Sequence, residues 1–106
     1  MGIEKKIGRL KKGKLNLITD VKGIKIGHKT LANGNIQTGV TAIIPTENNI
    51  FKEKFLCASY VINGFGKSVG LVQVDELGTL ETPIILTNTL SVGTALTSLV
   101  KYMLKN

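Results

Sequence analysis

The sequence predicts an α/β (α+β) domain in which four or five strands precede one long helix. Residues 24–89 are rich in aliphatic and β-branched side chains that form short runs between turn residues, which is typical of strands. Residues 91–105 change to the spacing of an amphipathic helix. A chain of 106 residues with 42% hydrophobic content has room for one hydrophobic core.

The first strands are predicted from alternation and from turn residues. Residues 24–28 alternate isoleucine with lysine or glycine, as in a half-exposed strand, with His28 at the end of that strand. The Asn-Gly-Asn sequence at 33–35 predicts a tight turn. The β-branched run that follows ends at Pro45, which cannot donate a hydrogen bond to a sheet.

The remaining strands are expected after a polar loop at residues 46–54. The run 55–64 is long and apolar, and its β-branched and aromatic residues disfavour a helix. Residues 70–78 and 83–89 are predicted as the last strands. No internal repeat or low-complexity tract interrupts this order.

The helix predicted at residues 91–105 has apolar side chains at spacings of three and four. Asn88, Thr89 or Ser91 is available to cap its first turn. Its polar face is rich in threonine and serine and has few lysines, which favours packing on a sheet over lying on a membrane surface.

The net charge of +7 is concentrated in a basic N-terminal arm, residues 1–14. Six basic residues against Glu4 give this arm a charge of +5, and residues 15–106, the predicted domain, hold the other +2. Such an arm could bind nucleic acid or an anionic membrane, but a solvated chain end is the simpler interpretation. The chain has no tryptophan and only 5% aromatic residues, which argues against stacking on nucleic acid bases.

The apolar runs are too short for a signal peptide or a membrane span. The single cysteine, Cys57, has no partner for an internal disulfide. These features favour a cytoplasmic location and no association with membranes.

The loop NGFGKSVG, residues 63–70, at first resembles a phosphate-binding loop. A Walker A motif would need glycine at position 61, and a dinucleotide-binding fingerprint would need glycine at position 69. Both positions are valine, Val61 and Val69. The run after the loop also predicts a strand where a phosphate-binding loop needs a helix. We therefore interpret the loop as a connection between strands.

Other candidates for chemistry are few. His28 is the only histidine, so a tetrahedral metal site would need mostly carboxylates, and no metal or other cofactor is predicted. Asp75, Glu76 and Glu81 form the only acidic cluster, and in a strand only one of the first two could face a pocket. Such a carboxylate could recognise an amine or cap a turn. No serine has a base near it in the sequence.

The blocks LNLITDVKGIKIGH, TGVTAIIP and VINGFGKSVGLVQVDELGTLETPIILTNTLSVG occur in an order that resembles one family, the L-aminopeptidase D-amidase/D-esterases and β-peptidyl aminopeptidases. The resemblance starts at Ile7 and is most specific in the third block. Lys22 departs from the proline that family members often have in this turn. The resemblance implies part of an αββα sandwich similar to that of N-terminal nucleophile hydrolases.

The resemblance also implies an activity. Members of the family cleave their own precursor before a serine, which then acts as the nucleophile that releases N-terminal residues from peptides, amides or esters. They need no metal and assemble as oligomers. The processing site and the nucleophile lie downstream of the matching segment, so we assign no catalytic residue to this chain. The chain is expected to be inactive alone and to need the missing C-terminal portion or a complementary chain.

Four residues are expected to contact the substrate of the complete enzyme: Asn63, Glu76, Asn88 and Thr89. Two alternatives remain open. The chain could be a truncated structural or interaction module without activity, or a small nucleic-acid-binding domain that uses the basic arm. A sheet and one helix taken from a four-layer sandwich leave an apolar face exposed, so the chain is expected to form a homo-oligomer or to bind a partner.

Overall fold

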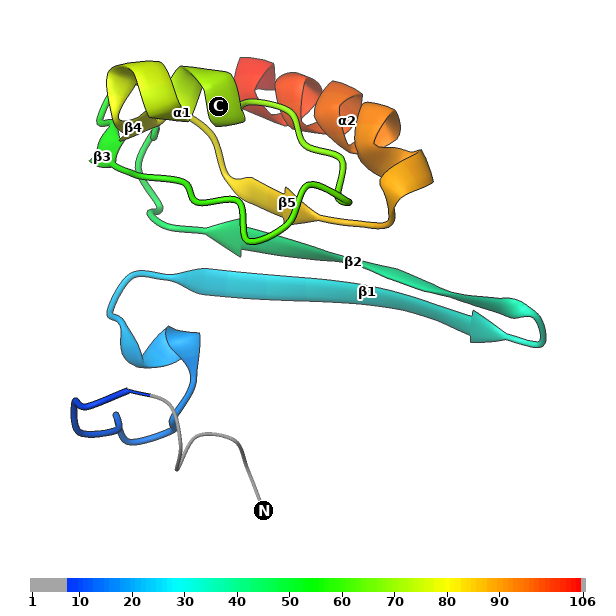
Figure 1. The fold of residues 1–106 in the computed structure, drawn as a ribbon, viewed down its shortest axis with the longest axis horizontal. Helices are drawn as coiled ribbons and strands as arrows, with labels where there is room; N and C mark the ends of the chain where they lie inside the picture. Colours follow the sequence, from blue (N-terminus) through cyan, green and yellow to red (C-terminus); the bar gives the residue numbers. More distant parts are fainter. Residues whose placement is uncertain (1–7, 106) are drawn as a thin grey trace.

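The computed structural model describes residues 8–105, which form a mixed α+β fold of antiparallel strands followed by a C-terminal helix (Figure 1). The elements are η2 (Ile18–Asp20), β1 (Lys25–Asn33), β2 (Ile36–Ile44), β3 (Phe55–Leu56), α1 (Leu71–Leu77), β4 (Thr79–Leu80), β5 (Ile84–Leu86), η3 (Thr89–Ser91) and α2 (Val92–Lys105). The predicted fold class, with its strands before one long helix, is confirmed.

A three-stranded antiparallel sheet in the order β1-β2-β5 forms the centre of the molecule. β1 and β2 pair over their whole length, from Lys25 opposite Ile44 to Asn33 opposite Ile36. The turn between them contains Gly34 at a φ of 56°, which suits glycine, so the predicted tight turn is confirmed. β5 pairs with only a short part of β2, so the far end of the hairpin extends beyond it (Figure 1).

The predicted strand at residues 70–78 is wrong, because this run forms the helix α1. Gly70 and Gly78 flank the helix at φ values of 92° and 65°, and the N–H of Gly78 donates a 2.8 Å hydrogen bond to the carbonyl of Val74. A left-handed glycine such as Gly78 commonly ends a helix, because glycine has no Cβ to oppose that conformation. The alternating valines suggested a strand, but Val74 is buried and its neighbours are not, as on a short helix.

The strand predicted at residues 55–64 is much shorter than expected. Only Phe55 and Leu56 pair with β4, and the Cys57 amide donates a further 2.9 Å hydrogen bond to the carbonyl of Gly78. Beyond this point the chain forms no helix or strand until α1, and Tyr60 and Ile62 are about 90% exposed. A strand needs a partner for its backbone groups, and none of the described residues supplies one here.

The long helix α2 is confirmed, but its apolar stripe is only partly covered. The half-buried side of the helix consists of Val92, Ala95, Leu99 and Met103. Beside it, Leu96 is 41% exposed, Val100 is 49% exposed and Leu104 is 83% exposed. A second apolar strip of α2 therefore has little to pack on within residues 8–105.

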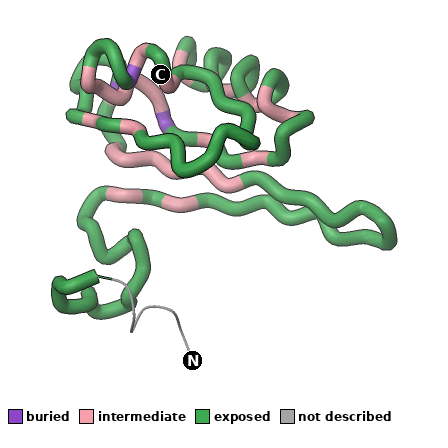
Figure 2. Tube along the Cα trace, in the orientation of Figure 1, coloured by how far each residue is buried: buried purple, intermediate pink, exposed green. Residues whose placement is uncertain are grey.

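Burial is slight and unevenly distributed. Among the described residues the buried positions are Ile50, Val74 and Pro83. Figure 2 places the buried positions in the half of the molecule that holds α1, whereas the far end of the hairpin is exposed on all sides. The predicted single core is therefore small in residues 8–105.

The predicted basic arm lies partly outside the described residues. Its residues 8–14 form no helix or strand and are exposed. Within residues 8–105 no helix has the length and apolar character needed to cross a membrane.

Candidate functional site

The two faces of the three-stranded sheet differ in what covers them. Successive side chains of a strand point to opposite faces, so the pairing assigns each residue to one face. We call the face toward α2 the inner face; it includes Lys29 and Leu31 of β1, Val40 and Ile44 of β2, and Ile85 of β5. The opposite, outer face consists of Ile26, His28, Thr30 and Ala32 of β1, Gln37, Gly39, Thr41 and Ile43 of β2, and Ile84 and Leu86 of β5.

A groove of about 320 Å³ lies between the inner face and the first half of α2. Its aliphatic lining is Leu31, Val40, Ile85 and Ala95, and its polar lining includes Lys29, Thr38, Asn88, Ser91, Thr94 and Ser98. We call it the Asn88 groove. Asn88 sits at the corner where β5 gives way to α2, a position where α/β proteins often bind ligands.

Asn88 is held in place from two directions. Its Oδ1 accepts a 3.0 Å hydrogen bond from the amide of Ser91, which caps the short helix η3. Its Nδ2 donates a 3.0 Å hydrogen bond to Oγ1 of Thr38 on β2. The sequence predicted Asn88, Thr89 or Ser91 as a cap for the long helix; in the structure Asn88 caps η3, which runs directly into α2.

The lining of the Asn88 groove suits binding more than acid–base chemistry. The side chains of Lys29, Thr38, Thr94 and Ser98 can donate hydrogen bonds to a ligand. No carboxylate or histidine is among the residues of the described chain that line the groove. His28 is in the middle of β1, not at its end as predicted, and belongs to the outer face, where its Nδ1 lies 2.8 Å from Oγ1 of Thr41.

The four residues expected to contact substrate do not form one site within the described chain. Asn88 lines the groove, and Thr89 follows it as the first residue of η3. Glu76 belongs to α1, which lies far from the first turn of α2 in Figure 1. Asn63 is in the glycine loop, where its Oδ1 accepts a 3.2 Å hydrogen bond from the amide of Phe65.

The three residues of the predicted acidic cluster, Asp75, Glu76 and Glu81, have different surroundings. The hydroxyl of Ser59 donates a 2.5 Å hydrogen bond to Oδ1 of Asp75, and the carboxylate of Glu81 lies 3.9 Å from Nζ of Lys54. Glu76 is exposed and makes no hydrogen bond or ion pair with another residue of the described part of the chain. Because α1 is a helix, the expectation that Asp75 and Glu76 point to opposite faces of a strand is wrong.

The glycine loop does precede a helix, contrary to the sequence prediction, but the case against a phosphate-binding loop stands on spacing. Positions 61 and 69 are still valine where the two motifs require glycine. The helix that follows is short and spans only Leu71–Leu77.

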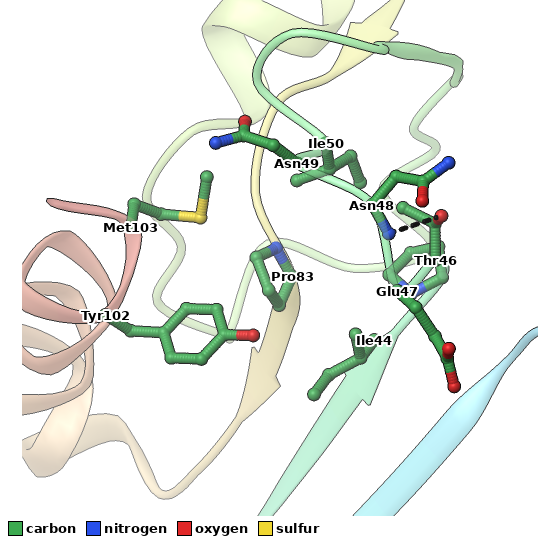
Figure 3. Close-up of a pocket in the computed structure, with 10 residues that line it drawn as sticks. Ile44, Thr46, Glu47, Asn48, Asn49, Ile50, Pro83, Tyr102 and Met103 are labelled. Atoms are coloured by element: carbon green, nitrogen blue, oxygen red, sulfur yellow. Dashed lines mark hydrogen bonds between the residues drawn. The ribbon is translucent and has the colours of Figure 1, made fainter. Parts of the chain in front are cut away.

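A smaller pocket of about 150 Å³ lies between the loop after β2 and the C-terminal end of α2 (Figure 3). Ile44, Ile50 and Pro83 line it from the sheet side, and Tyr102 and Met103 line it from α2. In the same loop, the carboxylate of Glu47 forms an ion pair with the ammonium group of Lys25. The hydrogen bond and the charge of Lys25 lower the pKa of Glu47 below its ordinary value of 4.5.

Sequence reasoning missed most of the groove. Thr38, Thr94 and Ser98 line it, together with Lys29. Thr94 and Ser98 lie four residues apart on α2, so helical spacing could have placed them on one face. Nothing in the sequence indicates the contact between Thr38 and Asn88, because these residues are fifty positions apart.

Comparison with known proteins finds relatives over most of the chain. The family model described as Peptidase family S58 matches residues 16–106. Two curated relatives are named beta-peptidyl aminopeptidase BapA. The protein from Sphingosinicella xenopeptidilytica is 39% identical over 90 residues, which cover 76% of this chain and 22% of that protein. The protein from Sphingosinicella microcystinivorans is 33% identical over 92 residues, which cover 78% of this chain and 23% of that protein.

Two solved structures share the fold. The PH0078 protein from Pyrococcus horikoshii OT3 has a TM-score of 0.89 and 54% identity, covering 99% of this chain and 33% of that chain. A Burkholderia sp. beta-aminopeptidase has a TM-score of 0.86 and 40% identity; the match covers 93% of this chain and 29% of that chain. The chain therefore spans less than a quarter of the length of the curated relatives and at most a third of the solved chains.

Proposed function

This chain belongs to peptidase family S58, and from that premise we propose that it is a segment of a self-processing serine aminopeptidase. The complete enzyme releases N-terminal residues from peptides, amides or esters. The chain supplies binding surface and scaffold, and another polypeptide segment supplies the nucleophilic serine. The observation that supports this best is the close match in sequence and fold to a beta-aminopeptidase over 93% of this chain.

The chemistry of the described residues agrees with a supporting role. A serine nucleophile needs a base within hydrogen-bonding reach. The only histidine, His28, is bonded to Thr41, and the hydroxyl of Ser59 is bonded to a carboxylate of α1. The groove offers hydroxyl, amide and amino groups that can donate hydrogen bonds to a peptide backbone, and its lining in the described chain includes no carboxylate or imidazole to act as a base.

We assign Glu76 to recognition of the free amino group that defines an aminopeptidase substrate. Its carboxylate is exposed and unpaired within the described residues, so it is available to bind an ammonium group. Asn63, Asn88 and Thr89 complete the proposed substrate contacts. In this proposal a single substrate contacts both the α1 end and the Asn88 end of the chain. The remainder of the enzyme forms the rest of the substrate site between them.

A chimeric enzyme tests the proposal. Residues of this chain replace the matching part of the Burkholderia beta-aminopeptidase, and release of p-nitroaniline from amino-acid p-nitroanilides is measured together with cleavage of the precursor. We expect the chimera to process itself and to turn over substrate, and the 106-residue chain alone to show no turnover. Turnover by the purified chain, or a folded chimera that neither cleaves itself nor hydrolyses substrate, contradicts the proposal.

The role of Glu76 has its own test in the same chimera. Glu76→Gln should raise KM by at least about tenfold with a smaller change in kcat, because the lost ion pair binds the ground state and the transition state alike. Glu53→Gln is the matched control, because Glu53 is also exposed but bonds to Asn48. Equal effects of the two substitutions on KM would show that Glu76 does not bind the substrate.

A further inference from the structure

Two asparagines in the chain are each followed directly by glycine, Asn33 and Asn63. In an Asn-Gly pair the backbone nitrogen of the glycine attacks Cγ of the asparagine side chain readily, because glycine has no Cβ to hinder the approach. A C–N bond forms and closes a succinimide ring, and the side-chain nitrogen leaves as ammonia with the proton of the glycine amide. Water then breaks one of the two C–N bonds of the ring, and the product is aspartate or isoaspartate.

The hairpin restrains the first of these pairs. Asn33 is the last residue of β1 and pairs with Ile36 of β2. The carbonyl oxygen of Gly34 accepts a 3.0 Å hydrogen bond from Nε2 of Gln37. Ring closure requires the backbone at Asn33 to rotate out of the strand conformation, which breaks these contacts. The reaction at Asn33 therefore proceeds only when the turn opens locally.

The second pair lies in a segment with few such restraints. Residues 58–69 form no helix and no strand, so no pairing with another strand holds the backbone there. Ile62, before the asparagine, and Phe65, after the pair, are each 90% exposed. A Cβ added to Gly64 would meet no atom within 4 Å, so the space around the attacking residue is open.

A local hydrogen bond also prepares Asn63 for the attack. Its Oδ1 accepts a 3.2 Å hydrogen bond from the amide of Phe65, two residues along the chain. This Asx turn folds the side chain back over the peptide unit of Gly64, which contains the attacking nitrogen. The hydrogen bond also draws electron density from Cγ of Asn63, which makes that carbon more electrophilic.

We propose that Asn63 is a site of spontaneous deamidation and that the fold selects it over Asn33. The reaction needs only water. Each conversion replaces a neutral amide by a carboxylate, so the formal net charge of the chain falls by one from +7. Isoaspartate also adds a methylene group to the backbone of the glycine loop. Asn63 is among the proposed substrate contacts, but its deamidation does not depend on the peptidase activity proposed above.

Mass spectrometry of proteolytic peptides tests the proposal after the folded chain has been incubated at mildly alkaline pH, which promotes loss of the glycine amide proton. We expect deamidation at Asn63 to be at least about tenfold faster than at Asn33, because the hairpin must open before Asn33 reacts. Unfolding in urea should bring the two rates together. Absence of reaction at Asn63, or an equal or faster reaction at Asn33 in the folded chain, overturns the proposal. A difference that persists unchanged in urea overturns it as well.

Two glycine variants test the chemistry at Asn63. Gly64→Ala should slow the reaction there at least about tenfold, because the new Cβ hinders the attacking nitrogen. Gly66→Ala is the matched control in the same loop, and it should leave the rate unchanged. Neither glycine has a positive φ, and an added Cβ meets no atom within 4 Å at either position, so both variants should fold. Equal slowing by the two substitutions, or no slowing by Gly64→Ala, contradicts attack by the Gly64 nitrogen.

Discussion

Asn88 on the corner before α2 donates a 3.0 Å hydrogen bond to Thr38 on β2, fifty residues away in the sequence. The same side chain accepts a hydrogen bond from the amide of Ser91. One asparagine thus caps the start of the helical segment and attaches it to the sheet. This double role makes the corner of the Asn88 groove sensitive to substitution.

Asn88→Ala should lower the free energy of unfolding by about 1–2 kcal/mol, because it removes a helix cap and leaves the Thr38 hydroxyl unpaired. Urea unfolding followed by circular dichroism measures the loss. Thr38→Val is the partial control, since it removes the bond to Asn88 but leaves the cap to Ser91 intact. A loss as large for Thr38→Val as for Asn88→Ala would mean that the cap contributes nothing.

The bond between Ser59 and Asp75 should couple the segment after β3 to α1. Ser59→Ala, Asp75→Asn and the double variant form a thermodynamic cycle, for which we expect a coupling of about 0.5–1.5 kcal/mol. Glu76→Gln is the control for loss of a neighbouring charge, because Glu76 has no bond to Ser59 and should show no coupling to Ser59→Ala. Additive effects of Ser59→Ala and Asp75→Asn would show that the bond does not stabilise the fold.

Glycine-to-alanine substitutions should have opposite effects at two positions. Gly78→Ala should destabilise by about 1 kcal/mol, because Gly78 ends α1 at a φ of 65° that disfavours a Cβ. Gly93→Ala, near the start of α2, should stabilise by up to about 1 kcal/mol, because a Cβ there meets no atom within 4 Å. Thermal or urea unfolding of both variants shows whether each substitution raises or lowers the free energy of unfolding. A stabilising Gly78→Ala would contradict the left-handed helix end.

The ion pair between Lys25 and Glu47 should add a small pH-dependent stabilisation. Lys25 lowers the pKa of Glu47 in the folded chain, so the pair stabilises the fold at neutral pH, above the ordinary carboxyl pKa. The stabilisation disappears as the pH falls through the lowered, folded-state pKa. Both side chains are exposed, so salt should weaken the effect.

The measurement for this pair is the difference in unfolding free energy between wild type and Glu47→Gln, followed from neutral pH down to about pH 3. The difference should shrink toward zero at the acid end. The control is the same substitution in a Lys25→Gln background, where no ammonium group is present to pair with Glu47. If the difference in unfolding free energy grew as the pH fell, Lys25 would not be lowering the pKa of Glu47 in the folded chain.

Local sequence was a reliable guide where neighbouring residues set the structure. The Asn-Gly-Asn turn fixed the hairpin, because positive φ at Gly34 is a local preference, and helical spacing identified α2. It failed at residues 70–78, where valines alternate as in a strand but Gly70 and Gly78 limit the run to a short helix. It failed again after Leu56, because β-branched residues form a strand only where a partner strand exists.

In the candidate site, too, the sequence predicted local features and not the contacts between distant residues. The sequence predicted Asn88 as a possible cap and as a substrate contact, because it lies at the junction of strand and helix, and the structure shows the cap. Its position opposite Thr38, the groove around it and the separation of Glu76 from both depend on how β5 pairs with β2 and how α2 crosses the sheet. Such relationships join residues far apart in the chain, so no local pattern encodes them.

The sequence by itself determined the family, the α+β class, the hairpin and the amphipathic character of α2, because motifs, turn residues and hydrophobic spacing are local properties. Only the tertiary structure decided that α1 is a helix, that Ser59 bonds to Asp75 and that, among the described residues, one face of the sheet has no lysine, arginine, aspartate or glutamate. The physical reason is that pairing and packing choose among the conformations that local preferences allow.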